Sequence, residues 1–442
     1  MESSFFLQHA TGTICIKKNY DPRVYNQQEI AKRDEQEDDK FRTLLSPDNK
    51  LTLVRHPEAE DGSSFPGYGK LTSLPPYNPN SKKYSEVDLR YSDLSLLDLR
   101  DMLSVLMHAD FDTKTRWPEK LPGTFNPNRI MELGKNPGLN VRWLHQRGIT
   151  GKGVGIAIID QALLVDHVEY KDNLKMYEEI HWPKKLNFAQ MHACAIASIA
   201  AGKTIGVAPG ADLYQIAEQH LLGYSEKTGI NADFTWLAKS IDRIVEVNKI
   251  LSAGKKIRVI SISNAWDIGW ASQLKGYKDL WRSIEEAKKE GLFIVSSTLN
   301  ETHNFNFHGL GRNSLSDPDN VLSYGPGLFW SKSFFEAGEN ALILGKYLMV
   351  PMDSRCTASP TGKNDYVFYS QGGLSWAIPY IAGLYALACQ VKPDINPEIF
   401  WAEGVRTGDT IEIEKNNKKY RFGTIVNPIK LIESIGKIKL FS

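Results

Sequence analysis

Three side chains of the kind used in nucleophilic catalysis stand where an α/β fold gathers its polar groups. Asp160 ends the apolar run Val154–Asp160, and a carboxylate buried there needs a partner for its charge. His192 opens a helical stretch of small residues, and Ser375 follows two glycines at the start of another helix. A carboxylate, an imidazole and a hydroxyl in one site can make the hydroxyl a nucleophile. Each residue alone also has a plain structural explanation, as a turn cap, a helix-start residue or an N-cap.

Short apolar runs alternate with helical patterns from Gly148 onward, which is typical of βαβ units around a parallel sheet. The predicted buried strands are Val154–Asp160, Leu213–Ala217, Arg258–Ser263, Leu292–Ser297 and Tyr347–Pro351. The predicted helices are His192–Ala201, Phe234–Leu251, Leu274–Glu290 and Ser375–Val391. This order predicts an α/β fold, a three-layer α/β/α sandwich with a mainly parallel central sheet. Ligands bind such sheets at the carboxyl ends of the strands, which is where Asp160 stands.

Four sequence blocks occur in the order typical of one peptidase family. They are Gly148–Asp160, His192–Ala200 with Gly206–Ala211, Gly291–Glu301, and Gly373–Gly383. With its candidates in the order Asp160, His192, Ser375, the chain resembles the subtilisin-like serine peptidases (subtilases) from Gly148 to about Ile435. The resemblance implies a serine endopeptidase that hydrolyses peptide bonds with an Asp-His-Ser triad, through an acyl-enzyme.

The resemblance also implies roles for residues beside the triad. The side chain of Asn300 and the backbone N–H of Ser375 would hold the oxyanion. The backbone of Ser263, Asn264 and Ala265 would pair with an extended polypeptide substrate as an added strand. Family members often carry calcium, but this sequence has no Asp/Asn-rich loop of the EF-hand kind. The sequence therefore assigns no cofactor and no metal ligand, and leaves calcium open.

The residues that follow the three triad positions depart from the family pattern. Gln161 follows the Asp where the family has Thr or Ser, Ala193 follows the His in place of Gly, and Trp376 follows the Ser in place of Met. These changes keep an alternative open: a weak or inactive subtilisin-like pseudopeptidase that acts as a peptide-binding or regulatory module. An α/β-hydrolase is excluded, because that fold needs a His after its nucleophile and all ten histidines precede Ser375.

Composition excludes several other classes of protein. The 53 Lys and Arg against 52 Asp and Glu leave a net charge of +1, which gives no field to gather nucleic acid. The four cysteines form no short-spaced cluster, so neither a zinc site nor a disulfide framework is indicated. No basic signal-peptide region opens the chain, and no apolar run reaches the ~18 residues of a membrane helix. We expect a cytoplasmic protein with a polypeptide substrate and no nucleic-acid or membrane partner; the oligomeric state stays unknown.

Residues 1–135 differ from the rest in their charge runs and in their loop-rich composition, so we divide the chain into an extension, 1–135, and a peptidase domain, 136–442. Asp-Leu pairs recur every five residues at 88, 93 and 98, as in pentapeptide repeats, but three units are less than one coil. We favour an apolar stripe that docks on the core, formed by Leu89, Leu94, Leu96, Leu97 and Leu99. Many relatives carry a removable pro-segment here. Without a signal peptide or alternating strands, we expect this extension to be retained.

Overall fold

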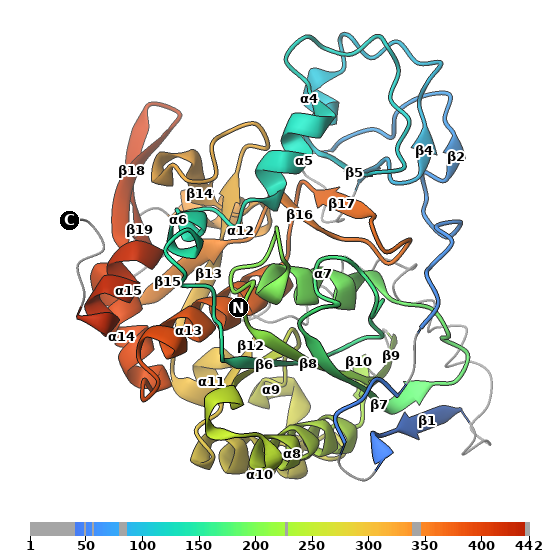
Figure 1. Cartoon of the computed structure of the whole chain (residues 1–442). Coiled ribbons are helices and arrows are strands. Elements are labelled where there is room, and N and C mark those ends of the chain that lie inside the picture. The colour runs from blue at the N-terminus through green and yellow to red at the C-terminus, as the bar shows by residue number, and fades with distance from the viewer. Residues whose placement is uncertain are drawn as a thin grey trace.

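The computed structural model describes residues 40–47, 50–54, 57–78, 86–225, 229–337 and 346–437. At its centre lies a six-stranded sheet in the order β1-β7-β8-β6-β11-β12 (Figure 1). Its strands are β1 Phe41–Leu44, β6 Gly155–Asp160, β7 Leu174–Pro183, β8 Asp212–Glu218, β11 Ile257–Ile262 and β12 Phe293–Ser296. Every neighbouring pair is parallel except β1 with β7. The predicted mainly parallel sheet is confirmed.

Helices cover both faces of this sheet, α8 and α10 on one face and α7 and α13 on the other (Figure 1). Alternating side chains of β6 explain the two faces, because Ile156 and Ile158 join the core beneath α7 and α13 while Ala157 and Ile159 join the core beneath α8 and α10. The result is the predicted three-layer α/β/α sandwich. The four helices are α7 Met191–Ala201, α8 Thr235–Ile250, α10 Tyr277–Lys289 and α13 Leu374–Val391.

Strand β7 was missed by the sequence analysis because two acids interrupt its apolar pattern. Glu178 and Glu179 both have 0% of their surface exposed. Glu178 pairs with Arg243 of α8 at 2.9 Å, and Glu179 pairs with Arg42 of β1 at 2.5 Å. Buried carboxylates persist when they are paired and hydrogen-bonded. Partners that lie far along the chain thus allow a charged segment to occupy the interior of the sheet.

The predicted strand Tyr347–Pro351 forms β15, but in a second sheet rather than in the central one. This five-stranded sheet has the order β14-β13-β15-β19-β18. An apolar run signals burial and does not identify the neighbouring strand, which is why the sequence could not separate the two sheets. The other strands are β13 Asn306–Arg312, β14 Tyr324–Pro326, β18 Asp409–Lys415 and β19 Lys418–Ile425. The remaining helices are α4 Leu103–Leu106, α5 Pro127–Lys135, α6 Val141–His145, α9 Ile268–Ala271, α11 Leu299–His303, α12 Leu328–Ala337, α14 Pro397–Thr407 and α15 Pro428–Gly436.

A third sheet joins the N-terminal segment, which we define as residues 57–78 and 86–120, to the rest of the chain. Its order is β16-β17-β5-β3, and β5 pairs antiparallel with β17. The strands are β3 Val87–Asp88, β5 Ala109–Asp112, β16 Arg355–Ala358 and β17 Tyr366–Tyr369. Two short strands, β2 Gly69–Lys70 and β4 Ser92–Asp93, pair beside it. The N-terminal segment is therefore hydrogen-bonded to the strand that precedes the candidate nucleophile.

The leucines of the N-terminal segment mostly lie inside it. Leu89, Leu94 and Leu99 are at most 3% exposed and share a core with Cys356 and Phe368. Their N–H groups donate to the carbonyls of residues 110, 116 and 120. Each of the three leucines is therefore hydrogen-bonded to a neighbouring segment of the chain. Leu97 is half-buried, whereas Leu96 is 72% exposed in a turn, and its expected docking was wrong. The division at residue 135 and the retention of the extension stay predictions.

Two sequence expectations concern membrane spans and cysteines. From the sequence we expect no apolar run as long as a membrane helix, but among the described helices α13 alone has the length and hydropathy of a spanning segment. Of this helix, 78% is buried inside the protein. Cys194, Cys356 and Cys389 are buried free thiols, and Cys15 lies outside the described residues. Burial raises the pKa of the Cys194 thiol to about 11, which keeps it protonated and unreactive at neutral pH.

Candidate active site

Asp160 lies at the carboxyl end of β6, in the middle of the central sheet. The residue is 9% exposed, and its Oδ1 accepts a hydrogen bond from the Gln161 backbone N–H at 2.8 Å. Five apolar or small residues precede it in the strand. They fix the strand inside the sheet and leave the first polar side chain at its end, where the crevice of a parallel sheet opens.

His192 is the second residue of α7, and its ring faces Asp160. Its Nδ1 lies 2.8 Å from Oδ1 and 3.0 Å from Oδ2 of the carboxylate. The helix start is fixed by a hydrogen bond from the Gln190 N–H to the Ala162 carbonyl in the loop that follows β6. The imidazole side chain is 22% exposed and the carboxylate 4%. With Nδ1–H donating to the carboxylate, Nε2 of a neutral ring is the acceptor, as a general base requires.

Ser375 is the second residue of α13, whose start lies against α7. The indole of Trp376 meets the His192 ring edge-on with centroids 5.8 Å apart. The Ser375 carbonyl accepts a hydrogen bond from Ser263 Oγ at 3.1 Å. Within the described residues no hydrogen bond joins the Ser375 hydroxyl to His192. Contacts of this kind are often long before substrate binds and shorten in the reacting complex.

Asn300 and the segment 263–265 follow neighbouring strands at the same edge of the sheet. Asn300 is the second residue of the short helix α11, and its side chain is exposed. The carbonyl of Asn264 accepts a hydrogen bond from the Ser297 N–H at 3.0 Å, and its own N–H donates to Ile262 at 2.7 Å. Because Asn264 is engaged on both sides, any pairing with a peptide would use its neighbours Ser263 and Ala265.

A buried acid–imidazole pair at the end of β8 was missed by the sequence analysis. Glu218 Oε2 lies 2.6 Å from Nδ1 of His220, and both residues are at most 6% exposed. Burial raises the pKa of the Glu218 carboxyl, and the charge of Asp160 adds to the rise. In the described part of the chain, Glu218 Oε1 and His220 Nε2 have no hydrogen-bond partner. The sequence contained a signal for this pair, because polar residues occur at the end of the apolar strand β8, just as Asp160 occurs at the end of the apolar strand β6.

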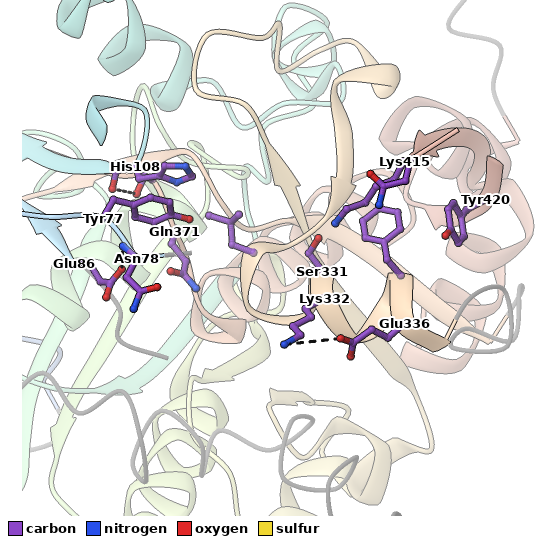
Figure 2. A pocket seen from close by; sticks show the side chains of 14 residues that line it. Tyr77, Asn78, Glu86, His108, Ser331, Lys332, Glu336, Gln371, Lys415 and Tyr420 are labelled. Atoms are coloured by element: carbon purple, nitrogen blue, oxygen red, sulfur yellow. Dashed lines mark hydrogen bonds and ion pairs between the residues drawn. The ribbon is translucent and has the colours of Figure 1, made fainter. Parts of the chain in front are cut away.

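A pocket of about 510 Å³ is lined in part by Ser370 and Gln371, which precede the helix that carries Ser375. Figure 2 shows Tyr77, His108 and Gln371 on one side and Lys332 and Lys415 on the other. The rings of Tyr77 and His108 stack with centroids 3.7 Å apart, and burial lowers the pKa of His108. The N-terminal segment thus forms one wall of a polar pocket, and α12 with the β18–β19 hairpin forms the other. Sequence analysis gave no indication of this pocket.

No metal centre is found among the residues that the structure describes. None of the His, Cys, Asp and Glu side chains there gather in a group of three or more that could hold an ion. His303 lies in α11 and His308 in β13, and burial lowers the pKa of each to about 4. Calcium binding stays open.

Comparison with known proteins identifies relatives for the larger part of the chain. The model of the subtilase family matches residues 151–423. A calcium-dependent protease of Trichormus variabilis is 26% identical over 245 residues, which cover 53% of this chain and 34% of that protein. Subtilisin-like protease 2 of Arthroderma otae is 25% identical over 236 residues, which cover 53% of this chain and 50% of that protein. The chain thus spans half or less of the length of these two relatives.

Solved structures that align with the chain include a macrocyclase domain and a maturation protease. The PatG macrocyclase domain aligns with 68% of this chain and 95% of its own length, at 14% identity and a TM-score of 0.43. The prenylagaramide maturation protease PagA aligns with 68% of this chain and 99% of its own length, at 12% identity and a TM-score of 0.42.

Proposed function

Since the chain belongs to the subtilase family, we propose that it is a serine endopeptidase that cleaves polypeptides through an acyl-enzyme. The observation that carries the proposal is the contact of His192 with both oxygens of Asp160, at 2.8 and 3.0 Å, directly beside the helix that presents Ser375. A carboxylate that fixes the imidazole through Nδ1 leaves Nε2 free to take a proton from a hydroxyl.

The proposed reaction proceeds in two halves. Nε2 of His192 takes the proton of the Ser375 hydroxyl while Oγ bonds to the scissile carbonyl carbon, and Asp160 stabilises the imidazolium. Collapse of the tetrahedral intermediate breaks the C–N bond, and the imidazolium gives its proton to the leaving amine. Water then attacks the ester with the same base, and Ser375 recovers its proton. The Ser375 N–H and the Asn300 side chain would hold the negative oxygen in both halves.

Two features around the triad favour a polypeptide substrate. Ser263 and Ala265 follow β11 at the open edge of the sheet, where an extended peptide could add as a strand. Gln371, four residues before Ser375, is one of the residues that line the pocket of about 510 Å³, and we expect this pocket to receive peptide residues beyond the scissile bond. Polar side chains from four separate stretches of the chain line it, as suits a peptide with varied side chains.

Covalent labelling with a fluorophosphonate tests the proposal. The wild type should be labelled at one residue, identified as Ser375 by peptide mapping, and Ser375→Ala should not react. Ser252→Ala, which removes an exposed hydroxyl elsewhere, serves as the matched control and should label like the wild type. A wild-type protein that neither labels nor cleaves any peptide would instead favour the pseudopeptidase, and peptide binding without turnover would then be measured by calorimetry.

A further inference from the structure

The link between β17 and α13 is short and sets the position of the nucleophile. β17 ends at Tyr369 and α13 begins at Leu374, so residues 370–373 alone connect the strand to the helix that carries Ser375. In this link Gly372 has no room for a side chain, because an added Cβ would lie 2.4 Å from the Met352 carbonyl oxygen. A displacement of the link would therefore move Ser375 relative to His192.

One end of the link is held by the N-terminal segment. Oδ1 of Asp110 accepts a hydrogen bond from the Ser370 backbone N–H at 2.8 Å and lies 3.0 Å from the Ser370 hydroxyl. The same hydroxyl lies 2.9 Å from the carbonyl oxygen of His108. Asp110 is in β5, is 1% exposed, and precedes the family-matched residues 151–423. A residue outside the family match thus contacts the link that precedes Ser375 directly.

The other end of the link is held by a second buried carboxylate. Oδ1 of Asp353 accepts from the Gly372 N–H at 2.8 Å, and its Oδ2 accepts from the Leu328 N–H at 2.7 Å. Burial raises the pKa of Asp353 to about 7, and the charge of Asp110 adds to the rise. Two acidic side chains from distant parts of the chain therefore accept hydrogen bonds from the backbone of residues 370 and 372 in the link.

The surroundings of Asp110 supply compensating charge. Arg90 of the same N-terminal segment is 2% exposed, pairs with Asp88 at 2.8 Å and contacts the Tyr369 hydroxyl at 3.3 Å. The charges of Asp88 and Asp110 both act to raise the pKa of its guanidinium, so Arg90 stabilises the two carboxylates together. Buried charges are expensive to desolvate, and they persist where they are paired and hydrogen-bonded as they are here.

We propose that Asp110 is a positioning residue for Ser375, supplied by the N-terminal segment and working opposite Asp353. It touches no substrate. Its carboxylate fixes Ser370, the link 370–373 transmits that fixation, and Ser375 stays aligned with His192 Nε2. The catalytic part of this inference rests on the proposed peptidase function, whereas the fixation of the link does not.

Three variants separate positioning from general stability. Asp110→Ala removes both hydrogen bonds to Ser370. Asp110→Asn keeps an oxygen at the same place, so it should retain most of the wild-type activity. Asp98→Asn, an exposed aspartate of the same segment that pairs with Arg100, is the matched control. If Asp110→Ala does not fold, Ser370→Ala is measured in its place, because it removes only the contacts of the Ser370 hydroxyl.

Three measurements are made on each folded variant: steady-state kinetics, the rate of fluorophosphonate labelling and amide hydrogen exchange. In Asp110→Ala we expect kcat and the fluorophosphonate labelling rate to fall together by ~10 to 100-fold with KM within about twofold, since a displacement of about 1 Å can cost 10² in rate. Asp110→Asn should lie within a few-fold of the wild type, and Asp98→Asn should equal it. Amide hydrogen exchange in the peptide that spans 369–376 should rise in Asp110→Ala and stay unchanged in Asp98→Asn.

Each outcome decides the proposal. Unchanged exchange in Asp110→Ala overturns it, whatever the activity. Raised exchange with unchanged kcat and labelling overturns the catalytic link. A higher KM at constant kcat would assign Asp110 to ground-state binding and also overturns it. If the wild type is not labelled at all, the proposed peptidase function fails, while the exchange experiment still tests whether Asp110 holds the link.

Discussion

Two sets of polar residues around the start of α13 differ in what they contribute. On the α7 side stand His192 and Asp160, with the imidazole 22% exposed toward the solvent. On the β17 side stand Asp110 and Asp353, each 1% exposed, and they bind backbone groups instead of reacting groups. A group that exchanges protons with substrate must be reachable, whereas a group that only positions others works best where water cannot compete for its hydrogen bonds. Two different sets of residues around the start of α13 would thus supply reactivity and positioning, and we call the first set the reactive side and the second the positioning side.

The largest effect is expected on the reactive side. Ser375→Ala or His192→Ala should lower kcat by ~10⁶-fold, the magnitude known for subtilisin itself, because either change ends nucleophilic attack. Thermal unfolding should shift by only a few degrees, since neither residue lies in the apolar core. Steady-state cleavage of a fluorogenic peptide together with calorimetry measures both. A drop in thermal midpoint above ten degrees would mean that the pair is structural.

A smaller loss is expected for the oxyanion position. Asn300→Ala should lower kcat by ~10² to 10³-fold with KM nearly unchanged, again the magnitude known for subtilisin, because the amide acts on charge that exists only in the transition state. Kinetics at saturating and low substrate separate the two constants. A higher KM at normal kcat would assign Asn300 to substrate binding.

The positioning side can be loosened from within the N-terminal segment. Leu94→Ala removes a side chain that is 0% exposed and should lower the free energy of unfolding by ~2 to 4 kcal/mol. If this segment holds the nucleophile, kcat should fall as well, at temperatures where the variant is folded. Leu96→Ala, two residues away and 72% exposed, is the control and should change neither quantity. A destabilised but fully active Leu94→Ala would show that the two sides are independent.

The last prediction concerns pH and Asp353. Its pKa rises from 3.8 in the unfolded chain to about 7 in the folded protein, so between pH 4 and 7 the folded state binds more protons. The free energy of unfolding should therefore fall as pH increases through this window, by up to about 1.4 kcal/mol per pH unit from this residue. Asp353→Asn should remove that slope. Urea unfolding of both proteins from pH 4.5 to 8 compares the slopes, and equal slopes would show that Asp353 is ionised throughout.

Much of the central fold could be predicted because its signals are local. The predicted helix Ser375–Val391 differs from α13 by one residue, and the apolar run before Asp160 became β6. Periodic apolar residues and short glycine-containing blocks show themselves within a few residues of sequence. The candidates Asp160, His192 and Ser375 could therefore be named, and the structure places the first two in contact.

What only the tertiary structure decided was the set of partners for buried polar groups. Glu178 is buried because Arg243 reaches it, and Asp110 holds Ser370, which lies 260 residues further along the chain. A single sequence shows that such acids exist but not which distant donor meets them, since burying a carboxylate is favourable only when its partner is brought close by the complete fold. For the same reason the candidates Asp160, His192 and Ser375 could be named from short motifs, whereas the contact of Asp110 with Ser370 became visible only when β5 paired with β17.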